Sequence, residues 1–224
     1  MTSDGFTRMI DDANAFFAEL KENNSKEWFD PRKAHYNEAI RKPAEFFAEL
    51  MAEDLSRLAG RAMQPKVFRI YRDVRFSKDK TPLNAHLHMM WAAASETPFS
   101  PFYFFGTEPG DMTVGFGISG LQKEGLAQFR AFVDREGDRL EEAIAQTGMR
   151  LSSWGEPPLK KVPKPYDADH PQAELLKRKN LILQDKMDDG WRRAEGGLVS
   201  AVRAAFERTE PVRLLVAEAL PGRA

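Results

Sequence analysis

The stretch that decides the fold class is residues 102–118, FYFFGTEPGDMTVGFGI. Two runs rich in aromatic and aliphatic residues, 102–106 and 112–118, flank the turn-forming letters TEPGD. This arrangement predicts an antiparallel hairpin, with a connecting loop longer than two residues. Because residues 102–105 are all aromatic, the first strand of the hairpin is expected to be buried on both faces.

Helical periodicity lies on both sides of this hairpin. Before it, apolar residues recur at helical spacing over 6–20, 31–40 and 46–58; Ser25 is a candidate N-cap and Gly60 a candidate stop. After it we expect a helix over 121–147, a short helix in 170–179, a strand at 181–183, and a helical region over 190–219 interrupted by Pro211. Helices at both ends around a largely antiparallel sheet define an α+β fold. We expect one domain spanning residues 1–224.

Two further segments ahead of the hairpin alternate with a period of two. In 66–76, one strand face would carry Phe68, Ile70, Arg72, Val74 and Phe76. The second segment, 85–93, alternates Leu87, Met89 and Trp91 with His86, His88 and Met90. Both segments are predicted to be strands.

Composition and charge restrict the possible environments. The chain has 224 residues, no cysteine and a net charge of −1, so disulfides and thiolate metal sites are excluded. No apolar run approaches the roughly 18 residues of a membrane span, and the amino terminus lacks a signal-peptide pattern. We expect a cytoplasmic protein with no membrane partner. Charge is unevenly distributed, with net +4 over 66–80 and net +3 over 159–180. Two basic islands in an otherwise acidic chain indicate local anion sites.

Arg72 is the most informative residue of the first basic island. On the predicted strand it would face the core, where an unpaired guanidinium is costly. It therefore requires either a structural ion pair with a carboxylate such as Asp73 or Asp79, or a bound anion gripped by its forked donors. The candidate ligand-binding set is Arg69, Arg72, Arg75, Lys78, Asp79 and Lys80, and the weak catalytic candidates are Asp73 and His86.

The histidines allow metal and acid–base alternatives. His86 and His88 form an HxH pair whose side chains would share one strand face and could supply two metal ligands. A plain surface or hydrogen-bonded pair is the alternative, and no HExxH accompanies them. His170, in DADHP, is either a tuned base or a residue of a helix start. The glycine run GFGISG lies in the hairpin, outside any strand–loop–helix nucleotide motif, and no cofactor is expected.

The stretch RIYRDVRFSKDKTP, residues 69–82, resembles the signature of the DUF2461 family of uncharacterised proteins. The early stretch FFAELKENNSKEWFDPRKAHY and the later block LKKVPKPYDADHPQAELLKRK, residues 159–179, also resemble that family. The family usually has Tyr after the DKxP element, where this chain has Leu83, so no role of that hydroxyl carries over. The resemblance implies relatives and no mechanism.

Three functions remain open from the sequence. The first is binding, with or without processing, of a phosphate- or carboxylate-bearing small molecule at the first basic island. The second is a nucleic-acid-associated module, in which both islands form one face aided by Tyr103 or another aromatic side chain. The third is a non-catalytic structural or interaction domain. Whether the protein is an enzyme is left open.

Overall fold

The computed structural model describes residues 3–93, 101–121, 123–152 and 154–220, which form two compact units. The first unit consists of Met1–Trp91, Phe104–Val114 and Lys186–Ala204, and the second of Ala92–Tyr103, Gly115–Asp185 and Ala205–Ala224. Each unit is therefore assembled from three separate stretches of the chain. The expected single-domain organisation stays a prediction.

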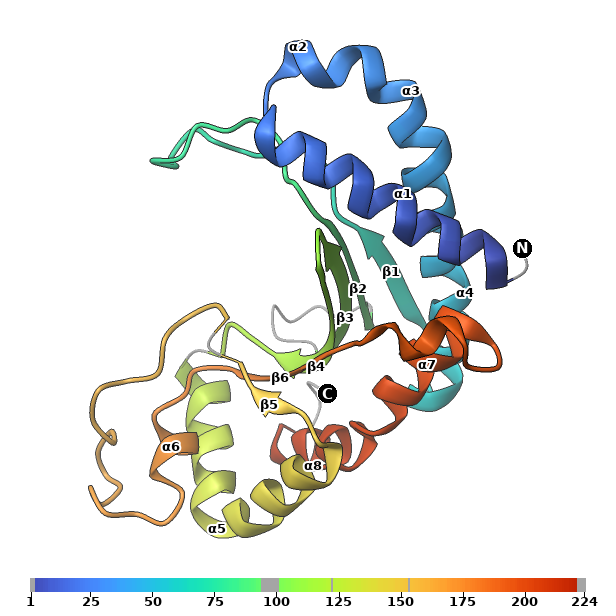
Figure 1. The fold of residues 1–224 in the computed structure, drawn as a ribbon. Helices are drawn as coiled ribbons and strands as arrows, with labels where there is room; N and C mark the ends of the chain where they lie inside the picture. Colours follow the sequence, from blue (N-terminus) through green and yellow to red (C-terminus); the bar gives the residue numbers. More distant parts are fainter. Residues whose placement is uncertain (1–2, 94–100, 122, 153, 221–224) are drawn as a thin grey trace. The chain divides into compact units, whose positions relative to one another are not determined.

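Four helices form the amino-terminal part of the first unit, and α1 and α4 lie beside β1 (Figure 1). They are α1 (Ser3–Glu22), α2 (Lys26–Phe29), α3 (Lys33–His35) and α4 (Lys42–Ala59), with a π-helical turn at Tyr36–Arg41 leading directly into α4. Ser25 accepts a hydrogen bond from the Trp28 amide (3.2 Å) as the N-cap of α2, and Gly60 ends α4 in the left-handed conformation (φ 68°). Both predicted helix boundaries are confirmed.

The sheet has six strands in the spatial order β1-β2-β3-β4-β6-β5 and is antiparallel, which confirms the α+β class. The strands are β1 (Met63–Val67), β2 (Leu87–Ala93), β3 (Phe102–Glu108), β4 (Asp111–Ile118), β5 (Arg150–Leu151) and β6 (Leu181–Lys186). The hairpin predicted at 102–118 is β3 and β4. Its loop is shorter than expected, because the strands extend to Glu108 and from Asp111 and leave only Pro109 and Gly110 between them. Gly110 supplies the positive φ (77°) that so tight a turn requires.

The second unit is built around the helix α5 (Lys123–Thr147). The helix α8 (Glu210–Ala219) and the short helix α6 (Ala173–Leu176) pack against it, and α7 (Gly197–Glu207) precedes α8 in the chain. Pro211 lies in the first turn of α8, where its missing N–H costs nothing, so it begins a helix as it interrupts the preceding helical region.

Aromatic side chains fill the core of each unit. In the first, Phe47 and Trp91 are fully buried where α4 packs on the sheet. In the second, Tyr103 is 1% exposed and packs against Phe116 and Phe206. Tyr103 is therefore a core residue and offers no stacking surface to a nucleic-acid base. Within the described residues, no helix combines the length and apolar character needed to cross a bilayer.

Candidate functional site

The first basic island lies on a long excursion between β1 and β2, residues 68–86, which we call the arm. Its two limbs run antiparallel and project beyond the strands that they connect (Figure 1). They pair through one bridge, Tyr71 with Leu83, and through hydrogen bonds from the Asn84 amide to the Ile70 carbonyl (2.7 Å) and from the Arg72 amide to the Pro82 carbonyl (2.9 Å). The arm is thus an irregular hairpin held together mainly near its base.

The prediction of a strand over 66–76 is wrong beyond Val67, where β1 ends. Side chains take over hydrogen bonds that a ladder would have made. Asp73 accepts from the Arg75 amide (3.2 Å) and Asp79 from the Thr81 amide (2.9 Å), which are local turns that compete with strand pairing. The alternation in burial fails as well, because Ile70 is buried while Phe76, predicted on the same face, is 95% exposed.

A single asparagine from the helical layer fixes the base of the arm. Asn24, which lies between α1 and α2, donates to the Leu83 carbonyl (2.9 Å) and accepts from the Leu83 amide (3.1 Å). The side chain thus pairs with Leu83 as a neighbouring strand would. Tyr71 packs edge-on against Phe29 of α2, with ring centroids 5.7 Å apart. The arm therefore leaves the first unit in a defined direction.

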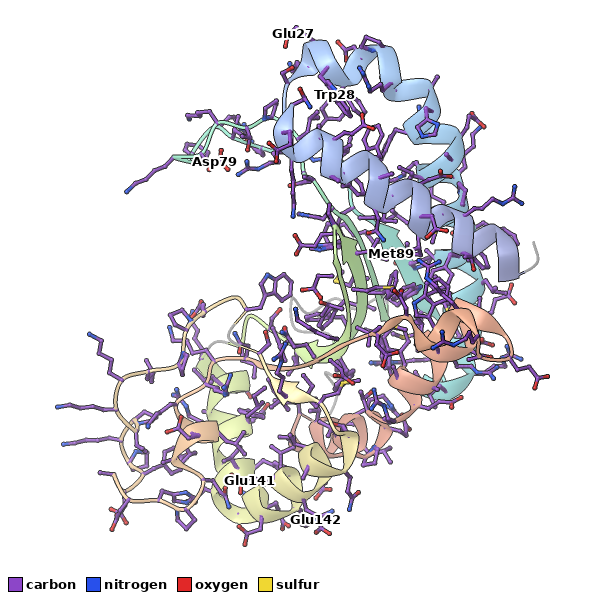
Figure 2. All side chains as sticks on the ribbon, viewed as in Figure 1. Glu27, Trp28, Asp79, Met89, Glu141 and Glu142 are labelled. Atoms are coloured by element: carbon purple, nitrogen blue, oxygen red, sulfur yellow. The ribbon has the colours of Figure 1, made fainter. Side chains whose placement is uncertain are left out.

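The two carboxylates of the arm are engaged by two of its arginines. Arg72 Nη1 lies 2.6 Å from Asp79 Oδ2 and also donates to the Thr81 carbonyl (3.0 Å). Arg75 grips Asp73 through two parallel contacts, Nε to Oδ1 (2.9 Å) and Nη2 to Oδ2 (2.6 Å). Figure 2 shows Asp79 on the projecting part of the arm. The Arg72 side chain is half-buried within the arm and does not enter the core as its place in the predicted strand required. It forms an ion pair with a carboxylate, which is one of the two alternatives that the sequence left open.

These contacts hold both carboxylates in the ionised form. The Thr81 amide, followed by the Arg72 guanidinium and the Thr81 hydroxyl, lowers the pKa of Asp79 to about 2. The Arg75 side chain lowers the pKa of Asp73 in the same way. A carboxylate with a depressed pKa is a poor proton acceptor at neutral pH. The geometry therefore favours a structural role over a catalytic one for Asp73.

Four cations of the arm and its first residues keep their charge uncompensated. With Asp73 and Asp79 occupied, Arg69, Lys78 and Lys80 of the arm make no ion pair among the residues that the structure describes. The same holds for Lys66, which lies on β1 just before the arm and has its Nζ over the Phe68 ring (4.9 Å to the centroid). Lys80 is nevertheless oriented, because its Nζ donates to the Val74 carbonyl (2.9 Å). The predicted ligand-binding residues thus divide into an internally paired set, Arg72, Arg75 and Asp79, and an uncompensated set, Arg69, Lys78 and Lys80.

His86 and His88 lie side by side where the arm returns to the sheet, as the HxH spacing predicts. Their rings stack with centroids 3.8 Å apart and an interplanar angle of 20°. His88 lies over Gly106, where an added Cβ would come within 2.5 Å of its Cδ2. Part of the His88 ring is accessible, yet partial desolvation and, to a smaller extent, the charge of the neighbouring His86 lower the pKa of His88 to about 4. Burial also lowers the pKa of His86. Both rings are therefore neutral at pH 7.

Among the described residues, the two histidines have no further side chain grouped with them that would complete a metal site. In the described part of the chain, no three His, Cys, Asp or Glu side chains are grouped so as to hold a metal ion. Glu108, the carboxylate whose charge acts on the pKa of His86, forms an ion pair with Lys21 (3.0 Å). His86 remains a candidate acid–base group only in the sense that its imidazole is neutral and partly accessible.

The second basic island belongs to the second unit, whereas the arm belongs to the first. Within that island His170 is fully engaged: its Nε2 lies 3.1 Å from Asp134 Oδ1, and its Nδ1 accepts from the Gln172 amide (3.0 Å). The second contact immediately precedes α6. His170 is therefore a helix-start residue, the structural alternative that its DADHP context offered.

A known protein family matches most of the chain. The family model described as "Conserved hypothetical protein (DUF2461)" matches residues 12–213. The chain belongs to the DUF2461 family. The arm and the second basic island both lie within the matched range. A search of the curated proteins found no match.

The Arg72–Asp79 contact yields a pH prediction. Because the pKa of Asp79 is depressed, the ionised carboxylate supports the arm at neutral pH, and this support is lost as the pH falls through about 2. In Arg72→Ala we expect the Asp79 pKa to rise, yet to stay below its ordinary value because the Thr81 amide, the larger cause, is retained. A carbon-detected NMR titration of the Asp79 carboxyl measures both values.

The matched control is Arg75→Ala, which should raise the pKa of Asp73 and leave that of Asp79 where it was. If Asp79 titrates identically in the wild type and in Arg72→Ala, the contact between Arg72 and Asp79 does not persist in solution.

Proposed function

We propose that the protein binds a phosphate- or carboxylate-bearing ligand through the arm. The observation that supports this most directly is the uncompensated charge of Lys66, Arg69, Lys78 and Lys80 beside two carboxylates that are already neutralised by other arginines. An anion approaching these four cations meets no competing carboxylate. Solvated lysines are common on any surface, but here the four cations are concentrated within residues 66–80.

The construction of the arm adds to this argument. Its base is pinned by Asn24 and by the Phe29–Tyr71 contact, so the cations are displayed on a partly ordered segment. Ordering before binding reduces the entropy lost when a ligand is gripped. In addition, the ion pair of Arg72 with Asp79 ties one limb to the other beside Lys78 and Lys80, and Lys80 donates to the Val74 carbonyl of the first limb.

One observation favours a nucleic acid as the ligand over a small metabolite. Phe76, at the outer turn of the arm, is 95% exposed, and the Arg75 guanidinium lies 5.8 Å from its ring centroid. An exposed aromatic ring among cations suits stacking on an unpaired base, which contributes about 1–3 kcal/mol per base. A small inorganic anion has no aromatic group that could stack on this ring.

Titration calorimetry with two kinds of probe tests the proposal. The probes are inorganic pyrophosphate and citrate as small anions, and a 12-nucleotide single-stranded DNA as the polyanion. We expect Arg69→Gln/Lys78→Gln to weaken binding of the effective probe about tenfold or more, because each charge-assisted contact contributes about 1.5–3 kcal/mol. The matched control is Arg8→Gln/Lys33→Gln, which removes the same charge from exposed positions of the first unit outside the arm.

The outcomes separate the candidates. Loss of DNA affinity in Phe76→Ser, together with a steep fall in affinity with salt, supports nucleic-acid binding. Pyrophosphate or citrate binding that is unaffected by Phe76→Ser supports a small anion. Equal weakening in the arm and control variants would show that the effect is one of net charge and would overturn the assignment to the arm.

A further inference from the structure

Two arginines carry charges that no ion pair in the described residues compensates: Arg178, within the second basic island, and Arg130, on α5. The island is residues 159–180, and its loop is folded back on its end: the Leu159 amide donates to the Lys177 carbonyl (2.9 Å), and Asn180 Nδ2 to the Glu156 carbonyl (3.2 Å). Lys177 pairs with Glu174 at 2.6 Å and Lys179 with Glu156 at 2.9 Å. Arg178, between these two lysines, makes no ion pair within the described residues.

The Arg178 guanidinium is only partly satisfied. Its Nη1 donates to the Ser152 carbonyl (2.8 Å), whereas its Nε is buried and has no hydrogen-bond partner in the described structure. Burial lowers the pKa of Arg178, and the charge of Glu174 offsets this only in part. The positive charge is therefore partly desolvated without a matching carboxylate, and an anion that paired with it would offset this cost.

Arg130, on α5, also has a guanidinium group with one buried nitrogen that lacks a partner in the described residues, and it is hydrogen-bonded to the segment just before Arg178. Its Nε donates to the carbonyl of Leu176 (3.0 Å), two residues before Arg178, while its Nη2 is buried without a partner. Burial also lowers the pKa of Arg130. The carboxylates available on α5 do not compensate it, because Asp134 is bound to His170 and Asp138 to Gln172.

We infer that Arg130 and Arg178 form a second anion site, independent of the arm, that takes a phosphate group. Arg130 is hydrogen-bonded to the Leu176 carbonyl, and Arg178 lies two residues further along the same segment. One oxyanion bound there would take forked donors from both guanidinium groups. A ligand with two negative charges would neutralise both arginines. Three exposed lysines of the loop, Lys160, Lys161 and Lys164, add charge attraction without an ion pair of their own in the described residues.

The alternative is that both arginines serve only to hold backbone carbonyls. Each makes one such hydrogen bond, which a neutral donor would make without the cost of a desolvated charge. A structural role therefore explains the bond from Arg130 to Leu176 and from Arg178 to Ser152, but not the choice of arginine at both positions.

Thermal unfolding in inorganic phosphate, compared with potassium chloride at the same ionic strength, tests the site. A ligand that binds only the folded protein raises Tm by mass action. We expect phosphate to raise the Tm of the wild type, and this rise to be lost in Arg130→Met and in Arg178→Met. In calorimetry, each variant should bind phosphate about tenfold more weakly, or weaker still. Without phosphate, the Tm of these variants should be unchanged or higher, because a desolvated unpaired charge has been removed.

Two controls make the result specific. Arg135→Met removes an exposed arginine of the same helix and should keep the full response to phosphate. Arg69→Gln/Lys78→Gln should also keep it, which separates failure of this site from failure of the arm. If either methionine variant does not fold, Arg178→Lys retains the charge without the fork and should bind phosphate more weakly. The site is refuted if phosphate has no effect beyond that of chloride, or if the methionine variants respond as the wild type does.

Discussion

Replacing Trp91 with alanine is expected to lower the free energy of unfolding of the first unit by about 3–5 kcal/mol. Trp91 lies on β2, is 0% exposed, and donates from Nε1 to the Ala48 carbonyl of α4 at 2.7 Å. The substitution removes a fully buried tryptophan side chain and leaves a cavity between the strand and the helix. It also takes away a buried hydrogen bond, so the loss of packing and the loss of a donor add together.

Because the chain forms two compact units, the measurement should report on the first unit alone. Hydrogen exchange of the β2 amides in increasing denaturant does so. The control is Trp91→Phe, which keeps an aromatic ring but loses the indole N–H and is expected to cost about half as much or less. A cost below about 1 kcal/mol for Trp91→Ala would mean that β2 is not held to α4 by this side chain.

The parts of the fold that follow from local signals were predictable from the sequence. The hairpin of β3 and β4 rests on two apolar runs around Pro109–Gly110, and the N-cap at Ser25 needs only the residues of its own first turn. The same holds for the side-by-side rings of His86 and His88, although β2 begins only at Leu87 and His86 directly precedes it, because residues two apart in extended chain share a face. In each case the residues that determine the structure are neighbours in the chain.

The arm shows where local reading fails. Its sequence alternates as a strand does, yet Asp73 and Asp79 form turns with the amides that follow them, and the limbs pair regularly only near Tyr71 and Leu83. The residue that fixes its base, Asn24, is 59 positions away from Leu83 and lies in a stretch that reads only as a break between helices. Nothing within either segment indicates the other.

The candidate sites divide in the same way. The charges of the arm were visible as a cluster in the sequence, but which cations pair and which remain uncompensated depends on how its two limbs meet. Arg130 gave no sequence signal, because it belongs to an ordinary amphipathic helix. It became a candidate only in the structure, where it bonds the carbonyl of Leu176 and has a buried Nη2 without a partner in the described residues. Desolvation of a charge depends on packing and has no local pattern.

The glycine run GFGISG has a packing explanation, and it leads to the second large effect. At Gly117 on β4, an added Cβ would lie 2.7 Å from the Leu181 carbonyl oxygen and 3.0 Å from Ile182 Cα. These are backbone atoms of the neighbouring strand β6, which cannot rotate aside as a side chain would. We therefore expect Gly117→Ala to destabilise the second unit by about 2–3 kcal/mol, at the upper end of the cost of overpacking.

The effect of Gly117→Ala should be concentrated where β4 meets β6. Hydrogen exchange at the β6 amides should become faster, and the β2 amides of the first unit should keep their protection. Ser119→Ala, just beyond the end of β4 and partly exposed, is the control and should change stability by about 0.5 kcal/mol or less. If Gly117→Ala stays within that same range, the two strands can separate by several tenths of an ångström without cost, and the glycine is not required for their close approach. A measured loss near 2 kcal/mol confined to the second unit would instead establish that glycine at position 117 serves the sheet, which leaves the arginines as the residues to test for ligand binding.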